Sequence, residues 1–84
     1  MNRDIVLAPN TDTRVQFIVV ENNNDEENSV SVLLADGSGI DSYVMYKYML
    51  PPRYALHLQV PAMVKVGTSL IVESSLPVLV AYGR

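Results

Sequence analysis

Polar and apolar residues alternate along most of this chain with a period of two. The clearest case is the stretch 53–60, in which Tyr54, Leu56, Leu58 and Val60 fall on one face and Arg53, Ala55, His57 and Gln59 on the other. This alternation predicts a strand with one buried face. Prolines stand at 51, 52 and 61, and because proline cannot donate a ladder hydrogen bond, we expect the strand to be confined between them.

Similar apolar runs occur along the rest of the chain, at residues 3–7, 13–21, 29–35, 43–50, 69–74 and 77–82. Between them lie clusters of turn-forming residues, including the polar segment 21–28 and the Asp36-Gly37-Ser38-Gly39 turn. Residues 62–68 read as a single turn or an irregular bend. About seven strands at this spacing predict an all-β fold, an antiparallel, jelly-roll-like β-sandwich, with residues 1–84 as one domain.

Several strands carry apolar residues on both faces. In 13–21, one face holds Val15, Phe17 and Val19, and the other changes from Arg14 and Gln16 to Ile18 and Val20. Leu33, Ile71, Leu79 and Ala81 likewise fall opposite the obvious core residues of their strands. We expect these second faces to be covered, because soluble monomers rarely expose large apolar patches.

The run 43–50 is rich in tyrosine. Strict alternation groups Val44, Tyr46 and Tyr48 on one face, opposite Tyr43, Met45, Lys47 and Met49. Tyrosine buries its ring and keeps its hydroxyl for water or a partner, so it suits interfaces. The alternatives are an outward face with rings lying on neighbouring residues and a contact between subunits. The candidate subunit or capsid contacts are Tyr43, Tyr46, Tyr48, His57 and Leu79.

The composition favours self-association. A chain of 84 residues buries only about 60 to 65% of the surface that its unfolded form exposes. Domains of this size usually need disulfides, a metal or oligomerisation, and this chain has no cysteine and one histidine. Charged residues make up 18% of the chain and hydrophobic residues 49%, which indicates apolar surface that another subunit covers.

The net charge of the chain and the motifs that it lacks argue against several functions. The net charge is −3 and the basic residues are scattered, which argues against a nucleic-acid partner. No apolar run approaches a membrane span, and residues 1–4 do not resemble a signal peptide, so we expect synthesis in a cytoplasm. His57 stands on a polar strand face with no acid placed beside it by spacing. We predict a protein that is not an enzyme and needs no cofactor.

The segment 21–28 raises one alternative. Its acids and asparagines resemble a calcium loop in composition, although the spacing of the best-known calcium loops and their central glycine are missing. A solvated hairpin loop explains the same residues through turn chemistry. A module that binds calcium or carbohydrate through loops 21–28 and 35–41 is therefore the second hypothesis.

The order of turns also resembles a known group of proteins. The motifs are Pro-Asn-Thr-Asp-Thr at 9–13, Val-Val-Glu-Asn-Asn at 19–23, Leu-Ala-Asp-Gly-Ser-Gly at 34–39, Leu-Pro-Pro at 50–52 and Val-Gly-Thr-Ser-Leu-Ile-Val-Glu-Ser-Ser at 66–75. On these motifs the chain resembles the small β-sandwich structural proteins of tailed bacteriophages, among capsid decoration (cement) proteins and short fibre or spike modules.

The resemblance implies a virion component that forms a homo-oligomer, often a trimer, and binds a larger assembly such as the major capsid protein or another virion protein. Because the chain shows neither arms nor a receptor-binding domain, a capsid decoration protein that stabilises a phage head is expected before a fibre. A collar or tail accessory protein remains the alternative. The resemblance defines no functional residue.

Overall fold

The computed structural model describes residues 1–36 and 42–84, apart from the side chains of residues 42 and 43. The described chain forms seven strands. They are β1 (Asn2–Leu7), β2 (Thr13–Glu21), β3 (Asn28–Ala35), β4 (Ser42–Leu50), β5 (Ala55–Val64), β6 (Ser69–Ser74) and β7 (Leu79–Gly83). The turn expected at 36–39 falls largely on residues 37–41, outside the described residues.

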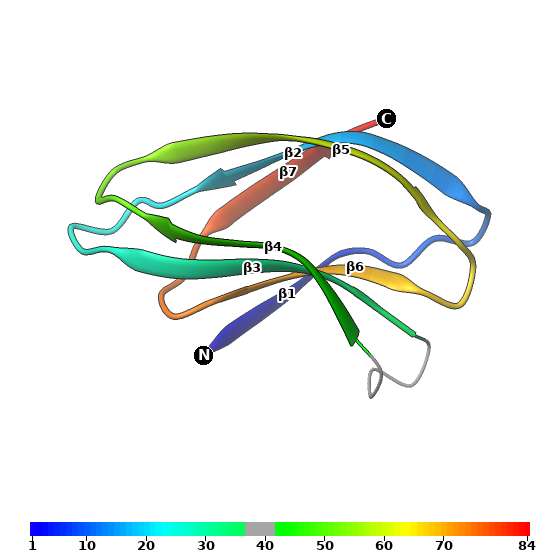
Figure 1. Cartoon of the computed structure of the whole chain (residues 1–84), viewed down its shortest axis with the longest axis horizontal. Coiled ribbons are helices and arrows are strands. Elements are labelled where there is room, and N and C mark those ends of the chain that lie inside the picture. Colours follow the sequence, from blue (N-terminus) through cyan, green and yellow to red (C-terminus); the bar gives the residue numbers. More distant parts are fainter. Residues whose placement is uncertain (37–41) are drawn as a thin grey trace.

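The strands form two facing antiparallel sheets (Figure 1). Sheet A has the order β1-β6-β3-β4, and sheet B has the order β5-β2-β7. Of the consecutive strand pairs, only β3 and β4 are neighbours in one sheet, so every other connection passes between the sheets. The predicted antiparallel β-sandwich of about seven strands is confirmed. In the described part of the chain, no helix is long and apolar enough to span a membrane.

The main core lies between the sheets and consists of side chains from all the longer strands. Its buried members are Val15, Ile18, Val20, Val30, Val32, Leu50, Leu58, Val60, Val64, Leu70 and Val72. Valine and isoleucine suit this position, because branched side chains pack well on a pleated surface. The alternation from Leu56 to Val60 points into this core as expected, with Leu58 and Val60 buried and Leu56 half-buried.

Two details of the strand predicted at 53–60 were wrong. Tyr54 lies outside β5 and is 46% exposed. Arg53 has a φ of 57°, in the left-handed region, so the chain turns at Arg53 and enters β5 only at Ala55. The strand also continues through Pro61 to Val64, a segment expected to be a bend. Pro61 is tolerated because β5 is an edge strand and pairs only with β2.

A β-bulge beside Pro61 changes the faces of β2. Val15 pairs with Ala62 and Phe17 with Gln59, so Gln16 alone stands opposite two residues of β5. Val15 faces inward before the bulge, and Ile18 and Val20 face inward after it. Phe17, two residues after Val15, is consequently 41% exposed. The predicted grouping of Val15, Phe17 and Val19 on one face is wrong, because the bulge interrupts the period of two.

Sheet A also buries residues on its outward face. Leu33, Ala35 and Ile71 form a second small cluster, and Leu33 and Ile71 are each 3% exposed. The register aligns Ile5, Ile71, Leu33 and Val44 in one row across the four strands. The central pair is buried as expected, whereas Ile5 and Val44 at the ends of the row are 65% and 52% exposed.

Candidate functional site

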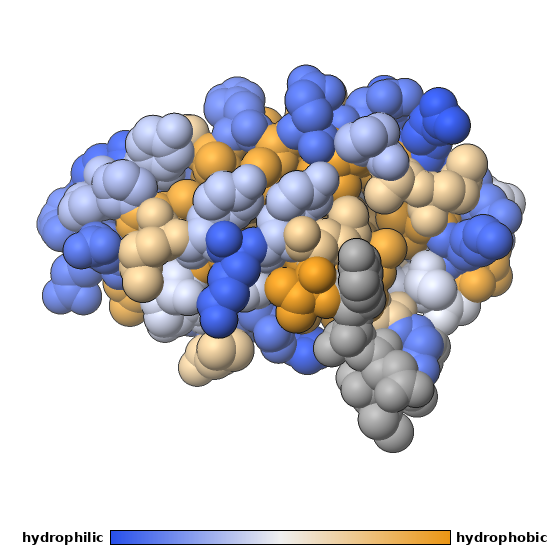
Figure 2. All heavy atoms as spheres, in the orientation of Figure 1, coloured by the Kyte–Doolittle hydropathy of each residue, from blue (hydrophilic) through white to orange (hydrophobic). Residues whose placement is uncertain are grey.

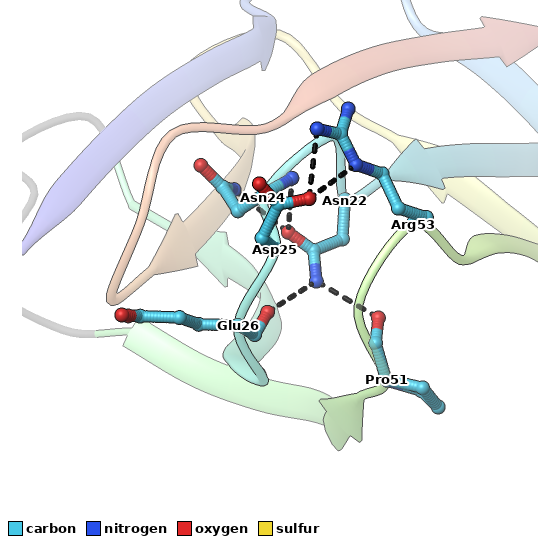
Figure 3. Close-up of polar contacts among 6 residues, drawn as sticks. All are labelled: Asn22, Asn24, Asp25, Glu26, Pro51 and Arg53. Carbon is cyan, nitrogen blue, oxygen red and sulfur yellow. Dashed lines mark hydrogen bonds and ion pairs between the residues drawn. The ribbon is translucent and has the colours of Figure 1, made fainter.

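Three loops meet at one end of the sandwich around a group of asparagines (Figure 3). The loops connect β2 to β3, β4 to β5 and β6 to β7. Asn22 and Asn28, at the two ends of the first loop, are completely buried. Buried amides must find partners inside the protein, since leaving them unpaired costs about 1 to 3 kcal/mol each. The sequence predicted a solvated loop here, and the structure adds an internal hydrogen-bond network.

Asn22 is the centre of this network. Its Nδ2 donates to the backbone carbonyls of Glu26 at 3.0 Å and Pro51 at 2.9 Å. Its Oδ1 accepts from the backbone N–H of Asn24 at 3.2 Å, from Asn24 Nδ2 at 2.7 Å and from Asn28 Nδ2 at 3.4 Å. One side chain therefore closes its own loop and ties it to the loop between β4 and β5 (Figure 3).

Asn24 and Asn28 tie the same loop to the segment before β7. Asn24 Nδ2 donates to the carbonyl of Pro77 at 2.8 Å, and Asn28 Nδ2 donates to the carbonyl of Leu76 at 3.0 Å. Asn28 Oδ1 accepts from Ser75 Oγ and from the Leu76 N–H, both at 2.9 Å. The three asparagines thus fix the path by which the chain enters β7.

An ion pair flanks the network on its exposed side. Arg53 donates to Asp25 Oδ1 through Nε at 2.8 Å, and a second guanidinium nitrogen lies 2.8 Å from the same oxygen (Figure 3). Both side chains are largely exposed, so the pair contributes at most about 1 kcal/mol to stability. It holds the tip of the first loop against Arg53.

This arrangement bears on the calcium hypothesis. A calcium ion needs several oxygen ligands pointing at one place. The amide oxygens of Asn22 and Asn28 accept hydrogen bonds from within the protein, and a carboxylate oxygen of Asp25 contacts Arg53. No group of three His, Asp or Glu side chains suited to a metal is found among residues 1–36 and 42–84. The described geometry gives calcium binding no support.

The tyrosine strand differs from its prediction. Val32 pairs with Tyr46 but Leu33 pairs with Val44, so β4 bulges at Met45. Tyr46 and Tyr48 stand opposite the core residues Val32 and Val30 and therefore lie on the inward side of β4. Val44 lies on the outward side with Leu33, so its predicted grouping with the two tyrosines was wrong.

The rings of Tyr46 and Tyr48 stack with centroids 6.4 Å apart and planes 16° apart. Tyr46 packs against the main core, and Tyr48 is 39% exposed. They lie on β4, the edge strand that pairs with β3 in sheet A (Figure 1). Figure 2 shows hydrophobic residues between hydrophilic ones on this side. The side chain of Tyr43, the third tyrosine of the prediction, lies outside the described part of the chain.

His57 and Leu79 lie elsewhere, on the outward face of sheet B. His57 pairs with Val19, and Leu79 pairs with Glu21 on the other side of β2. His57 is exposed and Leu79 is 61% exposed. The four candidate contacts whose side chains are described therefore do not form one surface: Tyr46 and Tyr48 face inward on sheet A, whereas His57 and Leu79 face outward on sheet B.

The outward face of sheet B becomes more apolar from β5 toward β7. Gln59 and His57 of β5 are followed across the sheet by Phe17 and Val19 of β2, and then by Gly83 and Ala81 of β7. A Cβ atom on Gly83 would collide with the ring of Phe17, so this ring lies over Gly83. The apolar end of the face is thus the edge formed by β7.

A groove runs between β7 and β1, the adjacent edge strands of the two sheets. Its volume is about 510 Å³, and its lining includes Ile5 and Val6 from β1 and Leu79, Val80 and Tyr82 from β7. A smaller hollow of about 220 Å³ lies between Leu79 and the loop residues Asn23 and Asn24. Sequence reasoning missed the groove, because alternation shows which residues face out but not which edge strands lie side by side.

Comparisons with protein-family models, with curated proteins and with solved structures find no match for this chain.

Proposed function

We propose that this chain is a non-catalytic structural protein that works as a homo-oligomer, most specifically a capsid decoration protein that stabilises the head of a tailed bacteriophage. The main support for an oligomer is the set of large apolar side chains exposed on the outward face of sheet B. Phe17, Met63 and Leu79 are 41%, 46% and 61% exposed there, on a domain of only 84 residues. Exposed apolar side chains that gather on one sheet face mark interaction sites.

The energetics point the same way. Burying a large apolar side chain contributes about 1.5 to 3 kcal/mol, and a domain of this size has a total stability of only about 4 to 13 kcal/mol. Covering a few such residues in a subunit contact therefore adds a large fraction of the monomer's own stability.

The virion assignment rests on the resemblance of the turn motifs, which also favours a trimer and a capsid protein as the larger partner. An acidic chain with a net charge of −3 fits binding to a protein surface better than binding to nucleic acid. In this role the protein would be made in the host cytoplasm and carried on the particle. Binding of a glycan or calcium at the asparagine end of the sandwich is the competing role.

Two measurements test the proposal. Light scattering on the purified chain with and without calcium gives its native mass, and mass spectrometry of purified virus particles from cells that make the chain shows whether it is a particle component. An oligomer indifferent to calcium that is found in particles supports the decoration role. A monomer at micromolar concentration that calcium stabilises contradicts it.

A further inference from the structure

The four edge strands of the described sheets differ in how well they are protected against pairing with another strand. Edge strands expose unpaired backbone N–H and C=O groups, and proteins block them with bulges, charges, prolines or short length. The edges here are β1 and β4 in sheet A and β5 and β7 in sheet B.

Three of these edges carry protective features. β1 has a register shift between Ile5 and Leu7 and exposes Arg3 and Asp4. β4 has the bulge at Met45 and exposes Lys47. β5 has Pro61 beside its own register shift. Each of these strands is therefore a poor template for a further strand.

β7 is the shortest of the seven described strands, with five residues, but it has no bulge, charge or proline. Its sequence from Leu79 to Gly83 is Leu-Val-Ala-Tyr-Gly, without charge or proline. Its pairing with β2 runs from Phe17↔Gly83 to Glu21↔Leu79 without a register shift. In an antiparallel ladder alternate residues direct their N–H and C=O groups to opposite sides, so about half of the backbone groups of β7 face its free edge.

The sequence of β7 is also complementary to itself. In an antiparallel pairing of two copies centred on Ala81, Leu79 of each copy stands opposite Gly83 of the other, and Val80 stands opposite Tyr82. The space above Gly83 is covered by the ring of Phe17, so Leu79 of the second copy would pack against that ring. The small Ala81 side chains meet at the centre without a clash.

The groove beside β7 suits the same arrangement. Val80 and Tyr82 are half-buried and pack against the main core on the inward side of β7. In an added strand the equivalent residues lie on the same side of the sheet, over the groove lined by Ile5 and Val6. Val6, which is partly buried against the main core, then gains an apolar neighbour.

We propose that the free edge of β7 pairs antiparallel with β7 of a second copy of this chain around a two-fold axis at Ala81, joining two copies of sheet B into one continuous sheet. The proposal deepens the oligomeric role proposed above by naming the contact. A two-fold contact alone gives a dimer, and it coexists with the three-fold axis expected from the resemblance in a dihedral or cubic assembly.

The test uses a single cysteine in a chain that otherwise has none. Cα atoms of directly opposed antiparallel residues lie about 4.5 or 5.5 Å apart, and both distances fall within the range of about 4.4 to 6.8 Å that a disulfide spans. Ala81→Cys is therefore expected to form a disulfide-linked dimer under mild oxidation. Ala55→Cys is the matched control, because Ala55 is also an exposed alanine on the outward face of sheet B, but on β5.

The expected result on a non-reducing gel is a doubled mass for most of A81C, under conditions that leave most of A55C as a monomer. Equal cross-linking of the two variants overturns the proposal. If A81C stays uncross-linked while the unmodified chain is an oligomer by light scattering, the β7 contact is wrong and the oligomeric function stands. If the unmodified chain is also a monomer, both are wrong.

Charge variants give an independent readout. Ala81→Lys and Ala81→Glu each place like charges opposite one another at the two-fold axis and are expected to lose the dimer. Mixing the two variants brings opposite charges together and is expected to restore it. Loss without restoration on mixing contradicts the pairing of Ala81 with its own copy, and Ala55→Lys is expected to leave the native mass unchanged.

Discussion

Removing the Asn22 side chain tests the hydrogen-bond network at the loop end of the sandwich. Asn22→Ala deletes two donated bonds, to the carbonyls of Glu26 and Pro51, and three accepted bonds, from Asn24 and Asn28. The site is fully buried, so the former partners are left inside the protein without Asn22. Asn24 and Asn28 keep their bonds to Pro77 and Leu76, which limits the damage to the contacts that Asn22 itself makes.

The size of the effect follows from these contacts. Five bonds at a net contribution of about 0.5 to 1.5 kcal/mol each give an upper range of about 2.5 to 7.5 kcal/mol. The bond from Asn28 is long at 3.4 Å, and water entering the cavity will pair some of the abandoned groups. We therefore expect a loss of roughly 2 to 4 kcal/mol, a large part of the stability of about 4 to 13 kcal/mol expected for a chain of this length.

Equilibrium urea unfolding measures this loss. With a slope of roughly 1 to 2 kcal/mol per molar urea for a small domain, the midpoint should fall by about 1 to 4 M. Asn23→Ala is the control, because Asn23 is an exposed neighbour in the same loop, and its midpoint should move by less than about 0.5 M. Equal midpoints for the two variants would show that the buried network does not hold the three loops together.

Three further outcomes follow from individual contacts. Ile71→Ala should lower the free energy of unfolding in urea by about 2 to 4 kcal/mol, even though Ile71 faces outward on sheet A. Ile5→Ala in the same row should lower it by less than about 1 kcal/mol, because Ile5 is largely exposed. Similar losses for the two variants would contradict the second buried cluster. Arg53→Gly should be more stable than Arg53→Ala by about 1 kcal/mol, because both lose the exposed ion pair but only glycine fits the positive φ without strain; the reverse order would contradict that backbone conformation. A calcium chelator should leave the midpoint of thermal unfolding unchanged, because we expect no calcium to be bound to the folded chain. Bound calcium would raise that midpoint, so a lower midpoint on chelation would revive the calcium hypothesis.

Much of the fold could be predicted from the alternation of residues. The strands and the inward face of β5 depend on local patterning that each strand carries in its own sequence. The faces of β2 and β4 could not be predicted, because the bulges opposite Gln16 and at Met45 arise from pairing between distant segments. One displaced residue moved Phe17 to the outward face and separated Val44 from the tyrosines.

The candidate site was less accessible to sequence reasoning. Asn22 and Asn28 look like ordinary turn residues, and only the meeting of three loops shows that they are buried. The only hint in the sequence was that several asparagines stand in one loop and at its ends. The sequence interpretation explained these asparagines by their preference for turns. The groove beside β7 depends on β1 and β7 being adjacent edges, and that adjacency follows from the strand order.

The native mass of the unmodified chain tests the central claim most directly. The chain has a mass of 9.3 kDa, and light scattering at several micromolar concentrations should give a whole-number multiple of it. Self-association through the apolar end of sheet B predicts an oligomer, and pairing through β7 predicts an even number of copies. A stable mass of 9.3 kDa across the concentration range would contradict the oligomeric structural role itself.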